Sequence, residues 1–104
     1  MTMLTVLAEI HTYSAVDCEM VVAALKNITA QVLQEQGCHG YQLYRDQAED
    51  SPFATQVAHS IIMFEQWQSV QHLQAYLDTA HMRTYKQQVK AHVQQVNLRL
   101  LTAE

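Results

Sequence analysis

The segment over residues 57–67 most constrains the fold, because it alternates like a β-strand and yet is apolar on both faces. One face presents Ile61, Met63, Glu65 and Trp67, and the other presents Ile62, Phe64 and Gln66. An antiparallel sheet with helices on one side leaves its second face in water, so this strand needs a cover on both faces. In a chain of 104 residues the simplest second cover is the sheet of a partner subunit. We therefore predict a homodimer.

Alternating apolar residues predict three further strands, over residues 4–10, 41–45 and 96–101, and helical spacing predicts a long amphipathic helix over 16–36. A polar segment over 47–52 forms a hairpin-like connection between the second and third strands. Two short helices follow the third strand, so the order is β-α-β-β-α-β with the second helix broken in two. This is the split βαβ or ferredoxin-like arrangement. We predict a single α+β domain over residues 1–104 with an antiparallel sheet.

Capping residues mark the helix ends in the sequence. Ser14 precedes the long helix and Asp17 follows three residues later, in a weaker relative of the capping box. Gly37 is a natural left-handed stop for the same helix. Ser69 can cap the first short helix, and the second short helix starts at residue 78 or 79.

Charge and composition exclude several classes of function. The net charge is −4 and the six Lys and Arg residues are scattered, so no basic patch is available and we predict no nucleic-acid partner. No apolar run approaches the ~20 residues of a membrane span, and residues 1–10 hold no charged leader, which predicts a cytoplasmic protein without a membrane partner. Cys18 and Cys38 are not spaced C-x-x-C and are predicted to stay unpaired. Two glycines are too few for a nucleotide-cradling loop.

Trp67 and Glu65 share one face at the end of the third predicted strand. Trp67 fits two interpretations, a core or interface side chain and the wall of a pocket for a flat ligand. A carboxylate on an inward-looking face is costly to bury unless it is paired. Glu65 could therefore orient a histidine or a ligand hydroxyl, or it could form a structural ion pair with Arg99 or Lys90.

His81 lies at the start of the last predicted helix, where the positive end of the helix dipole favours a neutral imidazole. A neutral imidazole can accept a proton, so His81 is a candidate general base; the alternative is a capping or surface histidine. Tyr85 lies one helical turn further on the same face. His92 follows His81 by eleven residues, about 16 Å along a helix, so the two cannot share a metal, and no H-x-x-x-H or H-E-x-x-H motif occurs.

Several stretches together resemble one known family. They are Leu4–His11 in the first strand, Glu35–Tyr41 at the corner between helix and strand, Glu65-Gln66-Trp67 with Ser69, His72, Leu73, Leu77, Thr79, His81, Met82 and Tyr85, and then Asn97 and Arg99. In this order and spacing the chain resembles the antibiotic biosynthesis monooxygenase (ABM) superfamily nearly from end to end. Within that superfamily it is similar to the small bacterial quinol monooxygenases.

The resemblance implies a ferredoxin-like subunit that pairs through its sheet into a dimeric α+β barrel. It also implies oxidation of a quinol or another electron-rich phenolic molecule by dioxygen, with no metal, flavin or other cofactor. On this hypothesis His81 is the base or an orienting group, Trp67 stacks on the substrate and Glu65 supplies a hydrogen bond. The other residues expected to contact the substrate are Met63, His72, Tyr76, Tyr85 and Arg99.

Departures from neighbouring branches leave two alternatives open. Haem-degrading members carry an asparagine on the first strand and a histidine about ten residues after the tryptophan, whereas this chain has no such asparagine and has Leu77. A branch that isomerises a phosphorylated autoinducer-2 derivative keeps a Thr-x-His stretch like Thr79-Ala80-His81, and its anionic substrate would need Arg83, Lys86 or Arg99. A non-catalytic dimer that binds planar hydrophobic ligands is the third interpretation.

Overall fold

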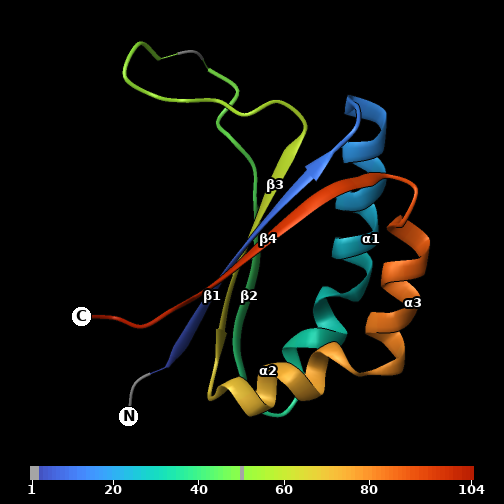
Figure 1. The fold of residues 1–104 in the computed structure, drawn as a ribbon, viewed down its shortest axis with the longest axis vertical. Helices are drawn as coiled ribbons and strands as arrows, with labels where there is room; N and C mark the ends of the chain where they lie inside the picture. Colours follow the sequence, from blue (N-terminus) through green and yellow to red (C-terminus); the bar gives the residue numbers. More distant parts are fainter. Residues whose placement is uncertain (1–2, 50) are drawn as a thin grey trace.

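The computed structural model describes residues 3–49 and 51–104 and shows one four-stranded antiparallel sheet with three helices against one face (Figure 1). The elements are β1 (Leu4–Thr12), α1 (Ala15–Leu33), β2 (Cys38–Tyr44), β3 (Ser60–Trp67), α2 (Val70–Leu77), α3 (Ala80–Val89) and β4 (Val93–Leu101). The strand order is β2-β3-β1-β4. The predicted α+β ferredoxin-like arrangement is confirmed, including the break between α2 and α3.

The two predicted serine caps stand at the N-termini of α1 and α2. The Ser14 hydroxyl accepts from the Asp17 backbone N–H at 3.1 Å and donates to the Asp17 carboxylate at 2.8 Å, so α1 begins one residue after Ser14. Gly37 has a φ of 83°, the left-handed conformation that glycine adopts without strain. The predicted helix over 16–36 is three residues too long at its end, because α1 stops at Leu33 and a turn precedes Gly37.

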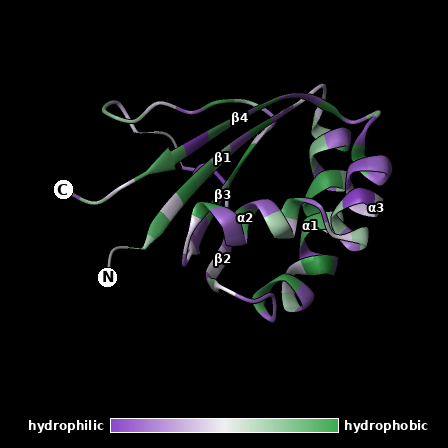
Figure 2. Cartoon of the chain, turned by 60° about the horizontal axis from the view of Figure 1, so that its bottom comes forward, coloured by the Kyte–Doolittle hydropathy of each residue, from purple (hydrophilic) through white to green (hydrophobic). Residues whose placement is uncertain are grey.

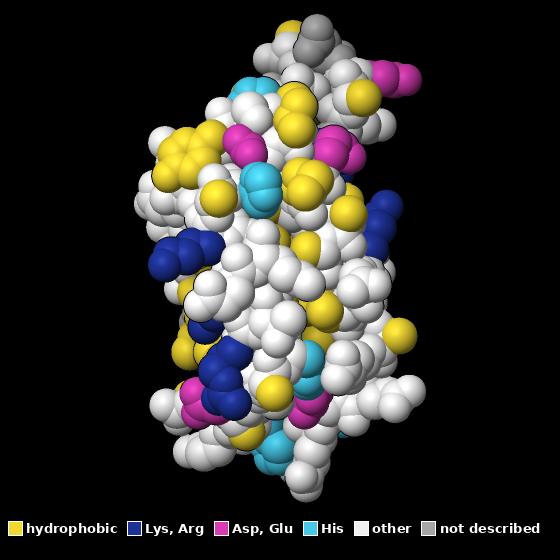
Figure 3. Space-filling view, turned by 90° about the vertical axis from the view of Figure 1, so that its right-hand side faces the viewer, with side chains coloured by type: hydrophobic (Ala, Val, Ile, Leu, Met, Phe, Trp, Pro, Cys, Tyr) yellow, Lys and Arg dark blue, Asp and Glu magenta, His cyan; other side chains and the backbone are white. Residues whose placement is uncertain are grey.

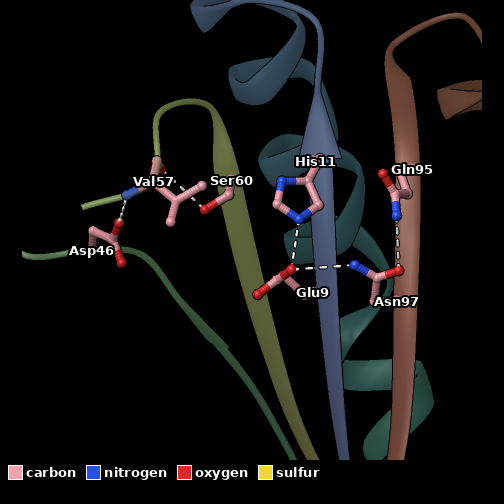
Figure 4. A network of polar contacts seen from close by, with 7 residues as sticks. All are labelled: Glu9, His11, Asp46, Val57, Ser60, Gln95 and Asn97. Atoms are coloured by element: carbon pink, nitrogen blue, oxygen red, sulfur yellow. Dashed lines mark hydrogen bonds and ion pairs between the residues drawn. The ribbon is translucent and has the colours of Figure 1, made fainter. Parts of the chain in front are cut away.

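The third strand begins at Ser60, three residues later than predicted. The chain turns before it, with His59 at a φ of 58°, and the Val57 N–H donates to the Asp46 carboxylate at 2.6 Å instead of to a neighbouring strand (Figure 4). The polar connection predicted over 47–52 lies between β2 and β3, with Asp50 outside the described residues. The connection between β2 and β3 is thus held by a polar contact between its own residues.

The core lies between the helices and the face of the sheet that we call the inner face. Cα pairing places Val6 opposite Glu65, Ala8 opposite Met63 and Ile10 opposite Ile61, so these side chains share that face. Helix α1 adds one buried stripe, which consists of Cys18, Val21, Val22, Leu25, Ile28 and Val32. Figure 2 shows the same division, with hydrophobic and hydrophilic residues on different sides of the helices. None of the helices in the described residues is long and apolar enough to cross a membrane.

The opposite face of the sheet, which we call the outer face, carries none of the helices in the described part of the chain (Figure 1). It presents apolar side chains in its middle, with Leu7 opposite Phe64 in the β1–β3 register and Phe64 38% exposed. Near one end it carries a polar network, in which His11 Nε2 lies 2.6 Å from a Glu9 carboxylate oxygen and Asn97 donates to that same oxygen at 3.3 Å (Figure 4). The outer face therefore combines an uncovered apolar centre with an ordered polar margin.

Candidate active site

A cavity with a volume of about 490 Å³ lies between the inner face of the sheet and the helices. Its size falls within the usual range for small-molecule sites. Its lining is mostly aliphatic, and the polar side chains in it are Tyr41, Glu65, Tyr76, Tyr85, Lys86 and Lys90. An apolar chamber with a few polar groups suits a flat hydrophobic molecule that bears hydroxyls.

Among residues 3–49 and 51–104, Glu65 is the only carboxylic acid that lines the cavity, and it is 6% exposed. Burial disfavours the charged carboxylate and raises the pKa of Glu65 to about 7. The Trp67 indole N–H donates to Glu65 Oε1 at 2.9 Å, a contact that favours the carboxylate and limits the rise. Near neutral pH this group can therefore exchange a proton with a molecule in the cavity.

Three tyrosine hydroxyls accompany the carboxyl group. Tyr41 lies directly across the β2–β3 pair from Glu65, and its hydroxyl is 3.1 Å from that of Tyr76. Burial raises the pKa of Tyr85 to about 12 and those of Tyr41 and Tyr76 well above their usual range. All three phenols therefore stay neutral at physiological pH and can donate hydrogen bonds.

Trp67 does not line the cavity but packs against residues that do. Its side chain is fully buried and stacks on the Tyr76 ring, with ring centres 4.9 Å apart and planes 23° from parallel. Tyr76 in turn meets the Tyr41 ring edge-on. Tyr76 reaches the cavity and Trp67 does not, so within this chain Trp67 holds Tyr76 and Glu65 in place. A stacking role for Trp67 on the substrate stays a prediction.

His81 lies beside the cavity lining and is not part of it. It is the second residue of α3, and its ring centre is 6.2 Å from that of Tyr76. Its Nε2 faces the Glu35 carboxylate at 3.2 Å and the Thr79 hydroxyl at 3.3 Å. This nitrogen is therefore engaged with the protein, and the role of His81 as a base stays a prediction.

The remaining predicted residues separate into two groups. Met63, Glu65, Tyr76 and Tyr85 come together in the cavity lining. His72 does not; its Nδ1 lies 2.6 Å from the hydroxyl of Ser69, the residue that caps α2. Arg99 pairs in register with Leu7 on the outer face, away from the cavity and from Glu65. Substrate-binding roles for His72 and Arg99 stay predictions, and the suggested Glu65–Arg99 ion pair is wrong because the sheet separates them.

Sequence reasoning gave Tyr41 and Lys90 no place in a substrate site, and both line the cavity. Tyr41 could have been placed by the strand pairing, because it lies on the same face as Leu43 and opposite Glu65. Lys90 could have been placed by helical spacing. It follows Lys86 by one turn, and Met82, Tyr85 and Val89 indicate which side of α3 faces the cavity.

The comparisons with known proteins decide the family. Residues 3–88 match the family model described as "Antibiotic biosynthesis monooxygenase". The chain belongs to this family. It is also 42% identical over 100 residues to a protein from Escherichia coli K12 named "Probable quinol monooxygenase YgiN", with 95% of this chain and 96% of that protein covered.

Solved structures agree on the fold of this family member. A Pseudomonas aeruginosa protein aligns with a TM-score of 0.83 at 25% identity, covering 100% of this chain and 96% of that one. A Methanosarcina mazei protein aligns with a TM-score of 0.82 at only 14% identity, covering 100% of this chain and 95% of that one. At such low identity the second likeness concerns the fold alone.

The Trp67–Glu65 hydrogen bond gives a testable prediction about the cavity carboxyl. In Trp67→Phe the indole N–H is gone, so the charged carboxylate loses a stabilising donor and the pKa of Glu65 should rise above about 7. The smaller ring should also lower the free energy of unfolding by about 1–3 kcal/mol. A titration of Glu65 followed by carbon-detected NMR measures the first effect, and an unchanged or lower pKa would contradict it.

Proposed function

We propose that this protein is a quinol monooxygenase that transfers one atom of dioxygen to the ring of its substrate and needs no metal or flavin. The observation that carries the proposal is a buried carboxyl group with a pKa of about 7 in an apolar cavity that fits an aromatic ring. The resemblance to a relative named a probable quinol monooxygenase supports the same class of reaction.

The first step of the proposed reaction is a proton transfer to Glu65. A phenolic hydroxyl has a pKa of about 10, so a carboxylate with a pKa of about 7 can accept its proton from a bound quinol at moderate cost. Loss of that proton makes the ring electron-rich enough to pass an electron to dioxygen. The Tyr85 hydroxyl can donate a hydrogen bond to an oxygen that becomes negative, and so can one of the Tyr41 and Tyr76 hydroxyls, because the other donates within that pair.

The electrons balance without an external reductant. A quinol and one dioxygen molecule give a hydroxyquinone and one water, because oxidation of the quinol to the quinone level supplies the two electrons that the second oxygen atom requires. One oxygen atom forms a new bond to a ring carbon that loses its hydrogen, and the other leaves as water. The mostly aliphatic lining surrounds the bound ring with apolar side chains.

Oxygen uptake tests this function. Purified protein that has been stripped of metals should consume dioxygen with menadiol faster than menadiol autoxidises. His81→Ala and Trp67→Phe in the same assay test the two predicted roles that the cavity geometry leaves open. An uptake that does not exceed autoxidation over a panel of hydroquinones would contradict the proposal and favour an isomerase or a non-catalytic binding protein.

We further propose that two copies pair through their outer faces, as the two-sided apolar strand predicts. Phe64, which is 38% exposed at the centre of that face, lies opposite the half-buried Leu7. Light scattering after size exclusion should give a mass near twice 11.9 kDa. Phe64→Glu should weaken the dimer at least tenfold because it buries a charge, whereas Phe53→Glu, in a loop and 92% exposed, should not. A wild-type mass of 11.9 kDa would contradict the pairing.

A further inference from the structure

Two lysines border the cavity at the C-terminal end of α3, and the proposed oxidation chemistry uses neither of them: Lys86 lies in the last turn and Lys90 is the C-cap. Lys86 and Lys90 belong to the cavity lining although both side chains are exposed. They lie one turn apart, beside the stripe of α3 formed by Met82, Tyr85 and Val89. Their aliphatic stems therefore cover apolar surface while their ammonium groups remain in water at the mouth of the cavity.

Neither ammonium group is neutralised by the protein. Among residues 3–49 and 51–104, none of the ion pairs involves Lys86 or Lys90. Glu65 is the only acid in the lining that the described part of the chain supplies, and it is buried whereas the lysines are exposed. The cavity thus has a carboxyl group inside and two unpaired positive charges at its opening. Figure 3 shows Lys and Arg side chains one below another on the α3 side of the molecule, with hydrophobic side chains beside them.

A purely structural role explains only part of this arrangement. Cations near the end of a helix interact favourably with its dipole, and Lys86 lies in the last turn of α3. That effect does not require the side chains to border a cavity. Arg83 on the same helix shows the contrast, since it donates to the Asp78 carbonyl at 2.7 Å and takes no part in the lining.

We propose that the cavity selects an aromatic substrate that carries an anionic substituent, with the ring inside and the anionic group between Lys86 and Lys90. This inference rests on the proposed function in so far as an aromatic ring occupies the cavity. An anion placed deeper would approach Glu65 and lose its water, whereas at the mouth it meets two cations and stays partly hydrated. The substrate is thereby oriented with its far end, where a hydroxyl can sit, toward Glu65.

A matched pair of ligands tests the inference without any turnover. 2-Naphthoate and 2-naphthamide have the same ring and nearly the same shape and differ by one negative charge. Calorimetry on the full chain should show that the naphthoate binds about three- to tenfold more tightly, the range that two partly exposed ion pairs supply. The Lys86→Gln/Lys90→Gln double variant should lose this preference and keep its affinity for the naphthamide. Lys26→Gln, an exposed charge on α1, is the matched control and should keep the preference.

Three other results of the calorimetry would overturn the inference. Equal affinity for the two ligands in the wild type, or a preference that survives in the double variant, means that the lysines do not select an anion. Absence of binding by both ligands means that the cavity does not take such a ring. Oxygen uptake with the uncharged menadiol judges the monooxygenase proposal separately, so a failure of one proposal can be told apart from a failure of the other.

Discussion

Replacing Glu65 by glutamine is expected to abolish most of the activity while making the protein more stable at alkaline pH. Glutamine has nearly the same shape and keeps an oxygen that can accept from the Trp67 indole N–H, so the cavity should retain its form. It cannot take up a proton from a quinol, and loss of a positioned base typically lowers rates by about 10²–10⁴-fold. Oxygen uptake with a hydroquinone measures this loss.

The stability change follows from the raised pKa of Glu65. The folded protein holds this pKa at about 7, above the ordinary value of 4.5 that applies to the unfolded chain. The protonated side chain therefore contributes its full stability below pH 4.5, and this contribution is lost as the pH rises toward 7. The difference between the two pKa values corresponds to a loss of at most about 3 kcal/mol in the free energy of unfolding at pH 8.

Urea unfolding at pH 4 and pH 8 measures this difference. Glu65→Gln should equal the wild type at pH 4 and exceed it by about 1–3 kcal/mol at pH 8, because glutamine is never charged. Glu19→Gln is the control, since that exposed side chain is paired with Arg45 on the surface and should change neither activity nor the pH dependence. A glutamine variant that is fully active, or that is less stable than the wild type at pH 8, would contradict the role given to Glu65.

The second large effect is expected at Gly37, between α1 and β2. An alanine there would have to adopt a φ of 83°, which costs a residue with a side chain about 1–2 kcal/mol. Its Cβ would also lie 2.4 Å from Cγ of the His72 ring. Moving that ring disturbs its contact with Ser69, the N-cap of α2. We expect Gly37→Ala to lower the free energy of unfolding by about 3 kcal/mol, as measured by urea denaturation.

Two variants separate the causes of that loss. Gly40→Ala is the matched control, because a Cβ at Gly40 would find its nearest neighbour, Gln66 Cβ, at 3.8 Å, an ordinary contact. It should change stability by less than about 1 kcal/mol. Adding His72→Ala to Gly37→Ala removes the ring atoms that make the two closest contacts and leaves only the His72 Cβ at 2.7 Å, so the double change should cost less than the sum of the two single changes. Equal effects at the two glycines would show that the close contact with His72 does not matter.

Local signals in the sequence were sufficient for most of the fold. Alternation identified β1 and β3, and the hydroxyls of Ser14 and Ser69 correctly marked the starts of α1 and α2. The start of β3 was missed because the Val57 N–H bonds to a side chain, Asp46, that lies across the connection and is distant in sequence. Such a tertiary contact overrides the strand pattern without leaving a periodic signal.

The candidate site was harder to predict, because a cavity depends on how elements pack. Glu65 was recognisable as a carboxyl on an inward-looking face, and the structure gives it the expected burial. His81 is placed at the start of α3 as predicted, but its Nε2 contacts the Glu35 carboxylate and the residue does not line the cavity. Alternation alone could not show that Arg99 faces away from Glu65, because that depends on the register of β4 with β1.

Isotope labelling can show whether this chain by itself inserts one atom of dioxygen into a quinol. Metal-free protein and menadiol are incubated under ¹⁸O₂, and the masses of the naphthoquinone products are measured by mass spectrometry. We expect a hydroxylated quinone that carries one ¹⁸O atom at its new hydroxyl, that forms faster than in protein-free buffer and whose yield is strongly reduced with Glu65→Gln. Unlabelled quinone with hydrogen peroxide as the only products, or labelling equal to the protein-free control, would contradict it.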